Sequence, residues 1–323
     1  MRSALLAAAI GLNWFLLVNL AVSAAIALVL GVRLAWRAAP PRVGGAAWLL
    51  LRIAPSATAL LVVAVAVLPA YVHFEPRGIV EPFGPWLSLL GSASAGLVAW
   101  TALRAVAAWL RARALERTWM RNAAPLAVAG APVPVFRVDR GVAGVTLAGI
   151  WRPRLFVTRS VADTLTAEEL EVVVAHEAGH RASWDNLKRL VLLASPDALG
   201  LTPFGRYVSS EWVSAAETAA DAHAVGRDPR RGVTLASALV KVARMLPVPS
   251  RRLLPMSTLN EGGPLAARVR RLTGVPPAPA SGWPLAWAAA AAVLLAALGT
   301  LSLDPAWLLP IHHATEWLVR LSS

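Results

Sequence analysis

Apolar residues along the chain form four long runs, separated by shorter polar segments. The runs cover about 12–32, 53–72, 85–103 and 283–303. Each is close to the roughly 20 residues that an α-helix needs to cross a bilayer. Tryptophans lie near several ends of these runs, as interfacial aromatic residues do. The pattern therefore predicts four transmembrane helices.

The stretch between the third and fourth runs has the mixed pattern of a folded domain. Short apolar runs at 133–138 and 155–158 predict strands. Helices are predicted from Thr166, where Glu169 three residues later completes a capping box, and over 207–225 and 233–246. The predicted domains are therefore 1–110 with three transmembrane helices, 111–280 as the folded domain, 281–303 as a fourth transmembrane helix and 304–323 as a short tail.

The apolar run at 190–204 is interrupted by Pro196 and Asp197. It is too short to predict a span. Two interpretations remain open for it: a segment of the domain core, or a piece that touches or re-enters the membrane near the functional site.

Composition supports a membrane protein, because 57% of the 323 residues are hydrophobic and only 15% are charged. Ordinary soluble domains carry about 25% charged residues. A wholly soluble protein and a disordered one are both excluded. The chain has no cysteine, which excludes disulfide scaffolds, thiolate metal sites and cysteine nucleophiles.

The net charge of +13 comes largely from arginines beside the predicted spans. They are dense in the loop after the first span, after the third and before the fourth, and sparse elsewhere. The positive-inside rule then predicts an external N-terminus, a cytoplasmic segment over about 104–281 and an external tail. This accounts for much of the basic excess, and no nucleic-acid partner is expected.

The clearest chemical motif is His176-Glu177-Ala178-Gly179-His180, within a segment predicted to be helical. Residues four apart lie on one face of a helix. His176 and His180 can therefore bind one zinc ion, and Glu177 beside the metal can accept a proton from water. The motif predicts a catalytic zinc site.

A catalytic zinc usually has three protein ligands and one open position. Without cysteine, the third ligand must be His, Asp or Glu. Glu217 and Asp221 are four residues apart on a predicted helix with an alanine-rich face, which permits close packing against the histidine helix. One carboxylate can bind zinc while the other holds a ligand histidine's second nitrogen. The spacing alone does not assign the two roles.

The H-E-x-x-H motif followed by Glu217 and Asp221 resembles the gluzincin metallopeptidases, which include HtpX-type, CAAX-prenyl-type and BlaR/MecR-type membrane proteases. Three further stretches, 148–154, 181–187 and 261–272, resemble the BlaR/MecR type. Four spans with the zinc domain between the third and fourth also match that family. The resemblance covers most of the chain.

This resemblance implies an α-helical membrane protein with an inserted α+β zincin-like metalloprotease domain. Glu217 is then the third zinc ligand, Asp221 the partner of a ligand histidine, and Glu177 the general base. The implied protein is a zinc endopeptidase of the bacterial inner (plasma) membrane with a cytoplasmic catalytic domain. Its substrate is a protein or peptide, with a transcriptional repressor in signal transduction as one candidate. Drug-sensing members continue into a penicillin-binding domain, so the short segment 304–323 argues against antibiotic sensing.

Several alternatives stay open. The protein can be a non-catalytic signal transducer with a structural zinc, or an HtpX-type protease that clears membrane proteins. An intramembrane protease is disfavoured by the charges around the H-E-x-x-H motif, which are costly in lipid. His223 and Tyr207 are candidates to stabilise an oxyanion, and the strand at 155–158 is a candidate edge for an extended substrate. The oligomeric state is not predicted.

Overall fold

The computed structural model describes residues 2–36, 43–74, 84–139, 141–142, 144–245, 255–259, 265–274 and 305–322. These residues belong to two compact units. The membrane unit comprises Met1–Ala102, Ser195–Val208 and Ala280–Ser323, and the α/β unit comprises Leu103–Ala194 and Ser209–Pro279. The predicted fourth span, 283–303, lies outside the described residues.

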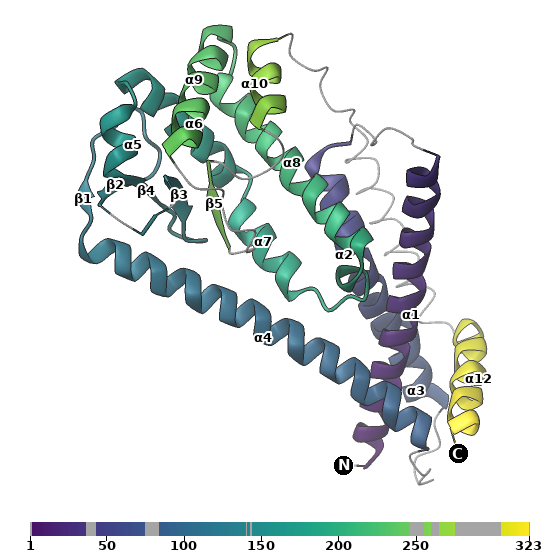
Figure 1. Cartoon of the computed structure of the whole chain (residues 1–323). Coiled ribbons are helices and arrows are strands. Elements are labelled where there is room, and N and C mark those ends of the chain that lie inside the picture. Colours follow the sequence, from purple (N-terminus) through teal and green to yellow (C-terminus); the bar gives the residue numbers. More distant parts are fainter. Residues whose placement is uncertain are drawn as a thin grey trace. The chain divides into compact units, whose positions relative to one another are not determined.

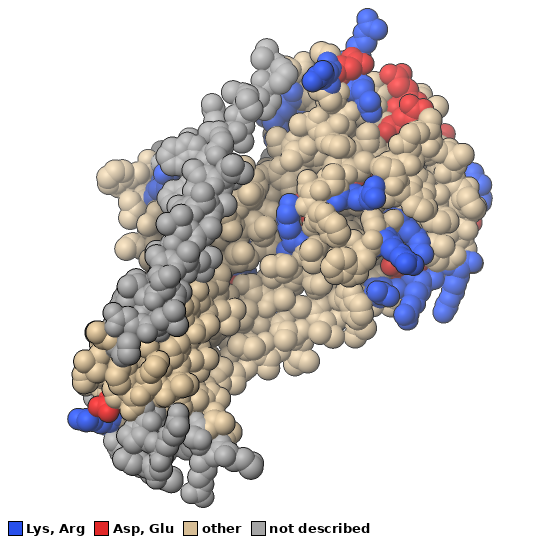
Figure 2. Space-filling view, turned by 180° about the vertical axis from the view of Figure 1, so that it is seen from behind, with Lys and Arg blue, Asp and Glu red and all other residues tan. Residues whose placement is uncertain are grey.

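The membrane unit is helical (Figure 1). Its helices are α1 (Arg2–Ala35), α2 (Gly45–Val62), the π-helical turn η1 (Val63–Val67), α3 (Leu68–Phe74), the first part of α4 (Pro85–Arg121), and α12 (Pro305–Ser322). Three helical stretches, Ala4–Ala35, Gly45–Phe74 and Pro85–Arg121, are long and apolar enough to cross a membrane. Three of the four predicted spans are therefore confirmed as candidate membrane helices. Most of their side chains visible in Figure 2 are uncharged.

The segment Ser195–Val208, which contains the 3₁₀ turn η2 (Leu199–Leu201), packs within the membrane unit. Asn19 of α1 donates a hydrogen bond to the Pro196 carbonyl and accepts one from the Ala198 amide, both at 2.9 Å. Arg52 of α2 forms an ion pair with the buried Asp197. Ser195–Val208 thus packs against α1 and α2, and contact of the run 190–204 with the membrane itself stays a prediction.

A five-stranded mixed sheet forms the centre of the α/β unit. Its strands are β1 (Ala124–Pro125), β2 (Val135–Val138), β3 (Val145–Ala148), β4 (Arg154–Thr158) and β5 (Met256–Thr258), in the spatial order β1-β2-β4-β3-β5. Strands β2 and β4 are parallel, and the other pairs are antiparallel. The predicted strands at 133–138 and 155–158 are confirmed. The prediction of a substrate edge at 155–158 is wrong, because β4 lies between β2 and β3.

Helices cover both faces of this sheet. They are α5 (Arg159–Thr164), α6 (Ala167–Ala182), α7 (Asp185–Ala194), α8 (Pro203–Val225, from Ser209 in this unit), α9 (Pro229–Met245), α10 (Leu265–Thr273), and α4 from Leu103. One face packs against α5, α6 and α9 in a core of Val, Leu and Ala side chains. The other face packs against α4, where the Trp119 and Phe156 rings lie 5.3 Å apart. The predicted fold class, a mostly helical membrane protein with a small α+β domain, is confirmed.

The predicted capping box fixes the start of α6. Thr166 Oγ1 accepts a hydrogen bond from the Glu169 amide at 3.1 Å, and the Glu169 carboxylate accepts one from the Thr166 amide at 2.9 Å. This satisfies two amides that a helix start leaves without intrahelical partners. Glu169 also binds Lys241 and Ser237 of α9, at 2.8 and 2.7 Å. The helix that carries the H-E-x-x-H motif is thus anchored at its N-terminus.

Candidate metal centre

Both motif histidines lie on the buried face of α6, one helical turn apart. His176 is 0% exposed and His180 1%. Their Nε2 atoms are 3.2 Å apart. Each ring therefore presents the same nitrogen to a single point, as the i, i+4 spacing predicts.

Glu217 reaches this point from α8, which crosses α6 closely. A Cβ added to Gly179 would stand 3.0 Å from the Cα of Ala220. Glycine and alanine at this crossing let the two backbones approach, as the alanine-rich face of the predicted helix suggests. The Glu217 carboxylate oxygens lie 3.4 Å from His180 Nε2 and 3.5 Å from His176 Nε2. Two histidines and one glutamate thus form one buried group.

The spacing of the two imidazole nitrogens is that of neighbouring ligands of a tetrahedral metal ion. Ligand bonds of about 2.0–2.1 Å at tetrahedral angles put neighbouring ligand atoms about 3.3–3.4 Å apart. The two Nε2 atoms are 3.2 Å apart, and the Glu217 carboxylate faces them with one oxygen each, Oε1 at 3.4 Å from His180 and Oε2 at 3.5 Å from His176. The donor set of two imidazoles and one carboxylate suits zinc and also other divalent transition metals. The geometry defines a candidate metal site and does not identify the metal.

Carboxylates hold the outward nitrogen of each histidine. Asp185 Oδ2 lies 2.7 Å from His180 Nδ1, and Asp221 Oδ1 lies 3.1 Å from His176 Nδ1. The hydrogen bond between His180 and Asp185 fixes the tautomer of a neutral His180 and leaves its Nε2 with a free lone pair, whereas the contact of His176 with Asp221 has an ion-pair distance without hydrogen-bond geometry. Three electron-rich atoms then face one another in a buried space, and a cation between them removes the repulsion.

A buried arginine supports the carboxylates. Arg268 of α10 is 2% exposed and contacts Asp221 with two nitrogens, at 3.1 and 2.5 Å. Its Nη1 lies 2.9 Å from Glu217 Oε2. The motifs of the sequence did not indicate the roles of Arg268 and Asp185. Both lie in stretches that resemble the BlaR/MecR type, but no spacing rule connects them to the motif.

Electrostatics in the metal-free site favours protonated histidines. Burial has the largest effect on His180 and lowers its pKa, but hydrogen bonds to Asp185 and Glu217 outweigh it and raise the pKa to about 10. Burial also lowers the pKa of His176, but the interactions with Asp221 and Glu217 outweigh it and raise the pKa. Burial raises the pKa of Glu217, but the two imidazoles and Arg268 outweigh it, and the pKa is lowered. The buried carboxylates therefore stabilise positive charge at this site.

Glu177 lies beside the metal group with one oxygen available. It is 0% exposed, and its Oε2 accepts a hydrogen bond from Ser257 Oγ of β5 at 3.1 Å. Its Oε1 is buried and has no hydrogen-bond partner in the described part of the chain. Burial raises the pKa of Glu177, and the neighbouring imidazoles oppose this only in part. A carboxylate of this kind is suited to accept a proton. Nothing in the sequence pattern indicated Ser257.

The structure brings together all five predicted site residues: His176, Glu177, His180, Glu217 and Asp221. The two oxyanion candidates are placed differently. Tyr207 lies in the membrane unit, where its ring packs edge-on against Trp48 at 6.0 Å. His223 lies in the α/β unit, on α8 next to Gly179 of the motif. A role for either residue in oxyanion stabilisation stays a prediction.

No protein-family model matches the chain, and no curated protein matches it either. Functional assignment therefore depends on the site and on the resemblance of the motifs.

Proposed function

We propose that this protein is a membrane-anchored zinc endopeptidase of the BlaR/MecR type. The observation that carries the proposal is the position of Glu177: a buried carboxylate, with one oxygen unengaged within the described residues, next to a group of three ligands. A structural zinc site is normally closed by four protein ligands and has no need of such a carboxylate. This weighs against the alternative of a non-catalytic transducer.

The residues of the site divide the chemistry between them. His176, His180 and Glu217 would hold zinc, and the ion would supply a Lewis acid that polarises a carbonyl and makes water more acidic. Glu177 accepts the proton of the attacking water at Oε1 and returns it to the leaving amine. Asp185 and Asp221 keep the two imidazoles oriented, and Arg268 balances the charge of the carboxylates.

The sheet beside the site supports a polypeptide as substrate. Strand β5 lies antiparallel to β3, with Ser257 opposite Leu147. Ser257 also contacts Glu177. The chain's own segment β5 thus lies extended at the edge of β3, with its middle residue beside the proposed base. A substrate that pairs with β3 would follow this path in exchange for β5.

The cellular role follows from the resemblance and the arginine distribution. We propose a multi-pass protein of the bacterial inner membrane whose catalytic unit faces the cytoplasm. There it would cleave a regulatory protein, with a transcriptional repressor as the leading candidate. Clearance of membrane proteins, as for the HtpX type, is the second candidate, and the site has the same ligands in both cases.

The substitution Glu177→Gln tests the proposal. It removes the base and preserves the size of the side chain, so zinc content should stay unchanged while peptide cleavage falls by about 10²–10⁴-fold. Cleavage of an unfolded protein such as casein by the purified, zinc-loaded protein provides the readout. Glu171→Gln, at an exposed position of the same helix, is the matched control and should retain full activity. Equal cleavage by Glu177→Gln and the parent would show that the base is assigned wrongly.

A further inference from the structure

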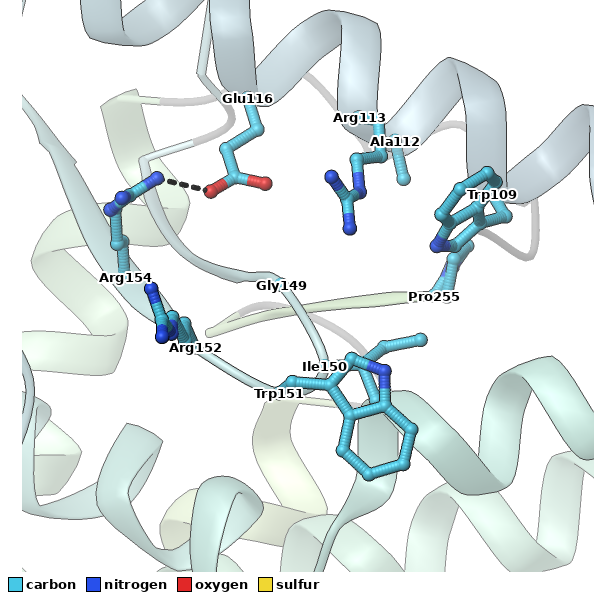
Figure 3. Close-up of a pocket in the computed structure, with 10 residues that line it drawn as sticks. All are labelled: Trp109, Ala112, Arg113, Glu116, Gly149, Ile150, Trp151, Arg152, Arg154 and Pro255. Carbon is cyan, nitrogen blue, oxygen red and sulfur yellow. Dashed lines mark hydrogen bonds and ion pairs between the residues drawn. The ribbon is translucent and has the colours of Figure 1, made fainter.

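A cavity of about 380 Å³ opens between α4 and the turn that joins β3 to β4 (Figure 3). Trp109 and Arg113 line it from α4, and Trp151 and Arg152 line it from the turn. None of the three residues of the candidate metal centre lines it. The cavity thus combines aromatic rings with guanidinium groups at a position separate from the metal centre.

Positive charge is in excess at this cavity, which is lined by three arginines and one glutamate. The glutamate, Glu116, is engaged by Arg154, since its Oε1 lies 2.8 Å from the arginine's Nη1. Arg113 lies over the Trp109 ring at 4.9 Å. Neither Arg113 nor Arg152 forms an ion pair with a carboxylate among the residues that the structure describes. The arginines therefore favour an anionic ligand, and a guanidinium group recognises phosphate with paired hydrogen bonds.

An exposed apolar stripe on α4 locates the membrane surface relative to the cavity. Leu103, Val106 and Leu110 are each more than half exposed, and their spacing puts them on one face of the helix. All three belong to the α/β unit, and they continue the surface of a helix that is long and apolar enough to cross a membrane. Arg104 lies about 100° around the helix from Leu103, and its long side chain can extend to the headgroups. The lipid-facing surface of α4 therefore extends to Leu110.

Arg113 follows this stripe by one helical turn. It comes three residues after Leu110, which is a rise of about 4.5 Å along the helix axis. The headgroup layer is about 5–8 Å thick on each side of the hydrocarbon. Arg113 therefore lies at the depth of the lipid phosphates, whether α4 is upright or tilted.

Exposed tryptophans from other elements of the α/β unit lie next to this position. The Trp151 ring is 5.9 Å from that of Trp184, and the two residues are 72% and 50% exposed. Trp184 directly precedes α7, which packs through Leu190 and Leu193 against the stretch of α4 that carries the stripe. Tryptophan is enriched at membrane interfaces, where its ring lies at headgroup level. The exposure of these rings is thus the exposure that contact with lipid requires.

We propose that this cavity binds the headgroup phosphate of an anionic phospholipid, with Arg113 and Arg152 as the groups that recognise it. Trp109 and Trp151 would pack against the lipid at the interface. The excess of positive charge favours a lipid with a net negative charge, such as phosphatidylglycerol, over a zwitterionic one. This site does not depend on the proposed endopeptidase function.

The bound lipid would set the height of the candidate metal centre above the bilayer. Asn186 of α7 joins the turn to the metal centre, because its Nδ2 donates hydrogen bonds to the carbonyls of Leu147 and Gly149, at 3.1 and 2.9 Å. The preceding residue, Asp185, contacts His180 Nδ1 at 2.7 Å. The wall of the cavity and the metal centre are therefore parts of one hydrogen-bonded framework.

Native mass spectrometry of the full-length protein tests for the lipid. The detergent-purified protein is titrated with phosphatidylglycerol or with phosphatidylcholine, and the bound lipid is counted. Phosphatidylglycerol should bind more tightly, and the double substitution Arg113→Gln/Arg152→Gln should weaken its binding about five- to thirtyfold. The control Arg227→Gln/Arg230→Gln removes the same charge from exposed positions outside the cavity and should bind phosphatidylglycerol as the parent does.

A nitroxide on the lipid headgroup locates the contact. The chain has no cysteine, so Trp151→Cys and Arg230→Cys each carry one fluorescent label at an exposed position. In nanodiscs that contain phosphatidylglycerol and the nitroxide lipid, the label at position 151 should be quenched more strongly. The label at position 230 is on α9, which covers the face of the sheet opposite to α4.

Phosphatidylglycerol binding that is equal in the parent and in Arg113→Gln/Arg152→Gln would overturn the lipid site. Equal quenching at positions 151 and 230 would overturn its position at the membrane surface. A polyglutamate peptide is titrated in the same way. If the two arginines were needed for the peptide and not for phosphatidylglycerol, the ligand would be an acidic polypeptide and the lipid proposal would be wrong.

Discussion

Each histidine of the candidate metal centre lies beside a carboxylate from a different helix. Asp185 of α7 holds His180, and Asp221 of α8 holds His176. Such partners fix the tautomer and raise the basicity of the ligand nitrogen. They also attract a proton when no metal is present, and the pKa of His180 rises to about 10. Protons and metal ions therefore compete for this site.

Zinc affinity should consequently rise with pH. His180 must lose its proton when the metal binds, so each proton displaced adds about tenfold in apparent affinity per pH unit below the pKa. In the metal-free protein, the contribution of His180 to folding stability changes with pH in the opposite direction. The folded pKa of about 10 exceeds the ordinary 6.5, so protonation of His180 stabilises the fold below pH 6.5, and this stabilisation is lost as the pH rises toward 10. Zinc titration with a competing chelator from pH 6.5 to 9 measures the first effect.

The substitution Asp185→Asn shows how much the carboxylate, as distinct from His180 itself, contributes to zinc affinity and to its pH dependence. Zinc affinity at pH 9 should fall about 10–100-fold, because the ligand loses basicity and orientation. The pH dependence should become shallower, since the pKa of His180 is no longer raised by Asp185. Asp163→Asn, an exposed position on α5, should behave as the parent. An affinity that does not vary with pH in the parent would contradict the tautomers assigned to the site.

At the scale of elements, the site depends on how closely α6 and α8 cross. Gly179 lies between the two ligand histidines in sequence and faces the backbone of α8 at Ala220. His223 of α8 is also close, since its Cβ lies 3.1 Å from a Cβ added at position 179. The middle of the H-E-x-x-H motif thus sets the distance at which Glu217 reaches the histidines.

Gly179→Ala should push α8 away from α6. The added methyl group has no free space, and overpacking of this kind costs about 1–3 kcal/mol. Zinc content should fall with the stability, because Glu217 moves with α8. Gly96→Ala is the control, since a Cβ there meets no atom within 4 Å, and alanine is the better helix former. Thermal unfolding and metal analysis of both variants in detergent provide the readout, and full zinc occupancy in Gly179→Ala would refute the close crossing.

The elements that the sequence predicted are those with a local signal. The spans, the capping box at Thr166 and the strands at 133–138 and 155–158 were evident from periodicity and spacing. Strand β3 was not predicted. All four of its residues are buried, so it lacks the alternation of buried and exposed positions that marks a half-exposed strand. Ser257, Asp185 and Arg268 reach the site through tertiary contacts between distant segments. No periodicity or spacing in the sequence encodes such contacts.

At the scale of the whole molecule, polar and apolar surfaces are separated. Most charged side chains visible in Figure 2 lie on the α/β unit. The membrane unit has exposed apolar side chains, such as Leu28 at 69% and Val72 at 65%. Side chains of this kind are expected to face lipid. The arginine distribution then predicts which side of the membrane each part occupies.

The absence of cysteine makes this topology directly testable. Asp163→Cys places a single thiol at an exposed position of α5, and Glu316→Cys places one on α12, where the side chain is 41% exposed. In intact cells, a membrane-impermeant maleimide should label the α12 thiol and leave the α5 thiol unlabelled. Inverted vesicles should show the reverse. Labelling of both thiols from one side would contradict the predicted topology.

The most direct test of the proposed function is the metal content of the detergent-purified protein. The proposed zinc site of His176, His180 and Glu217 predicts close to one zinc per chain, and much less in Glu217→Ala, since this variant would lose one of three ligands. The matched variant Glu211→Ala removes a carboxylate outside the group and should keep its zinc. A folded parent that holds no zinc even after zinc is supplied, or a Glu217→Ala variant with full occupancy, would contradict the metallopeptidase.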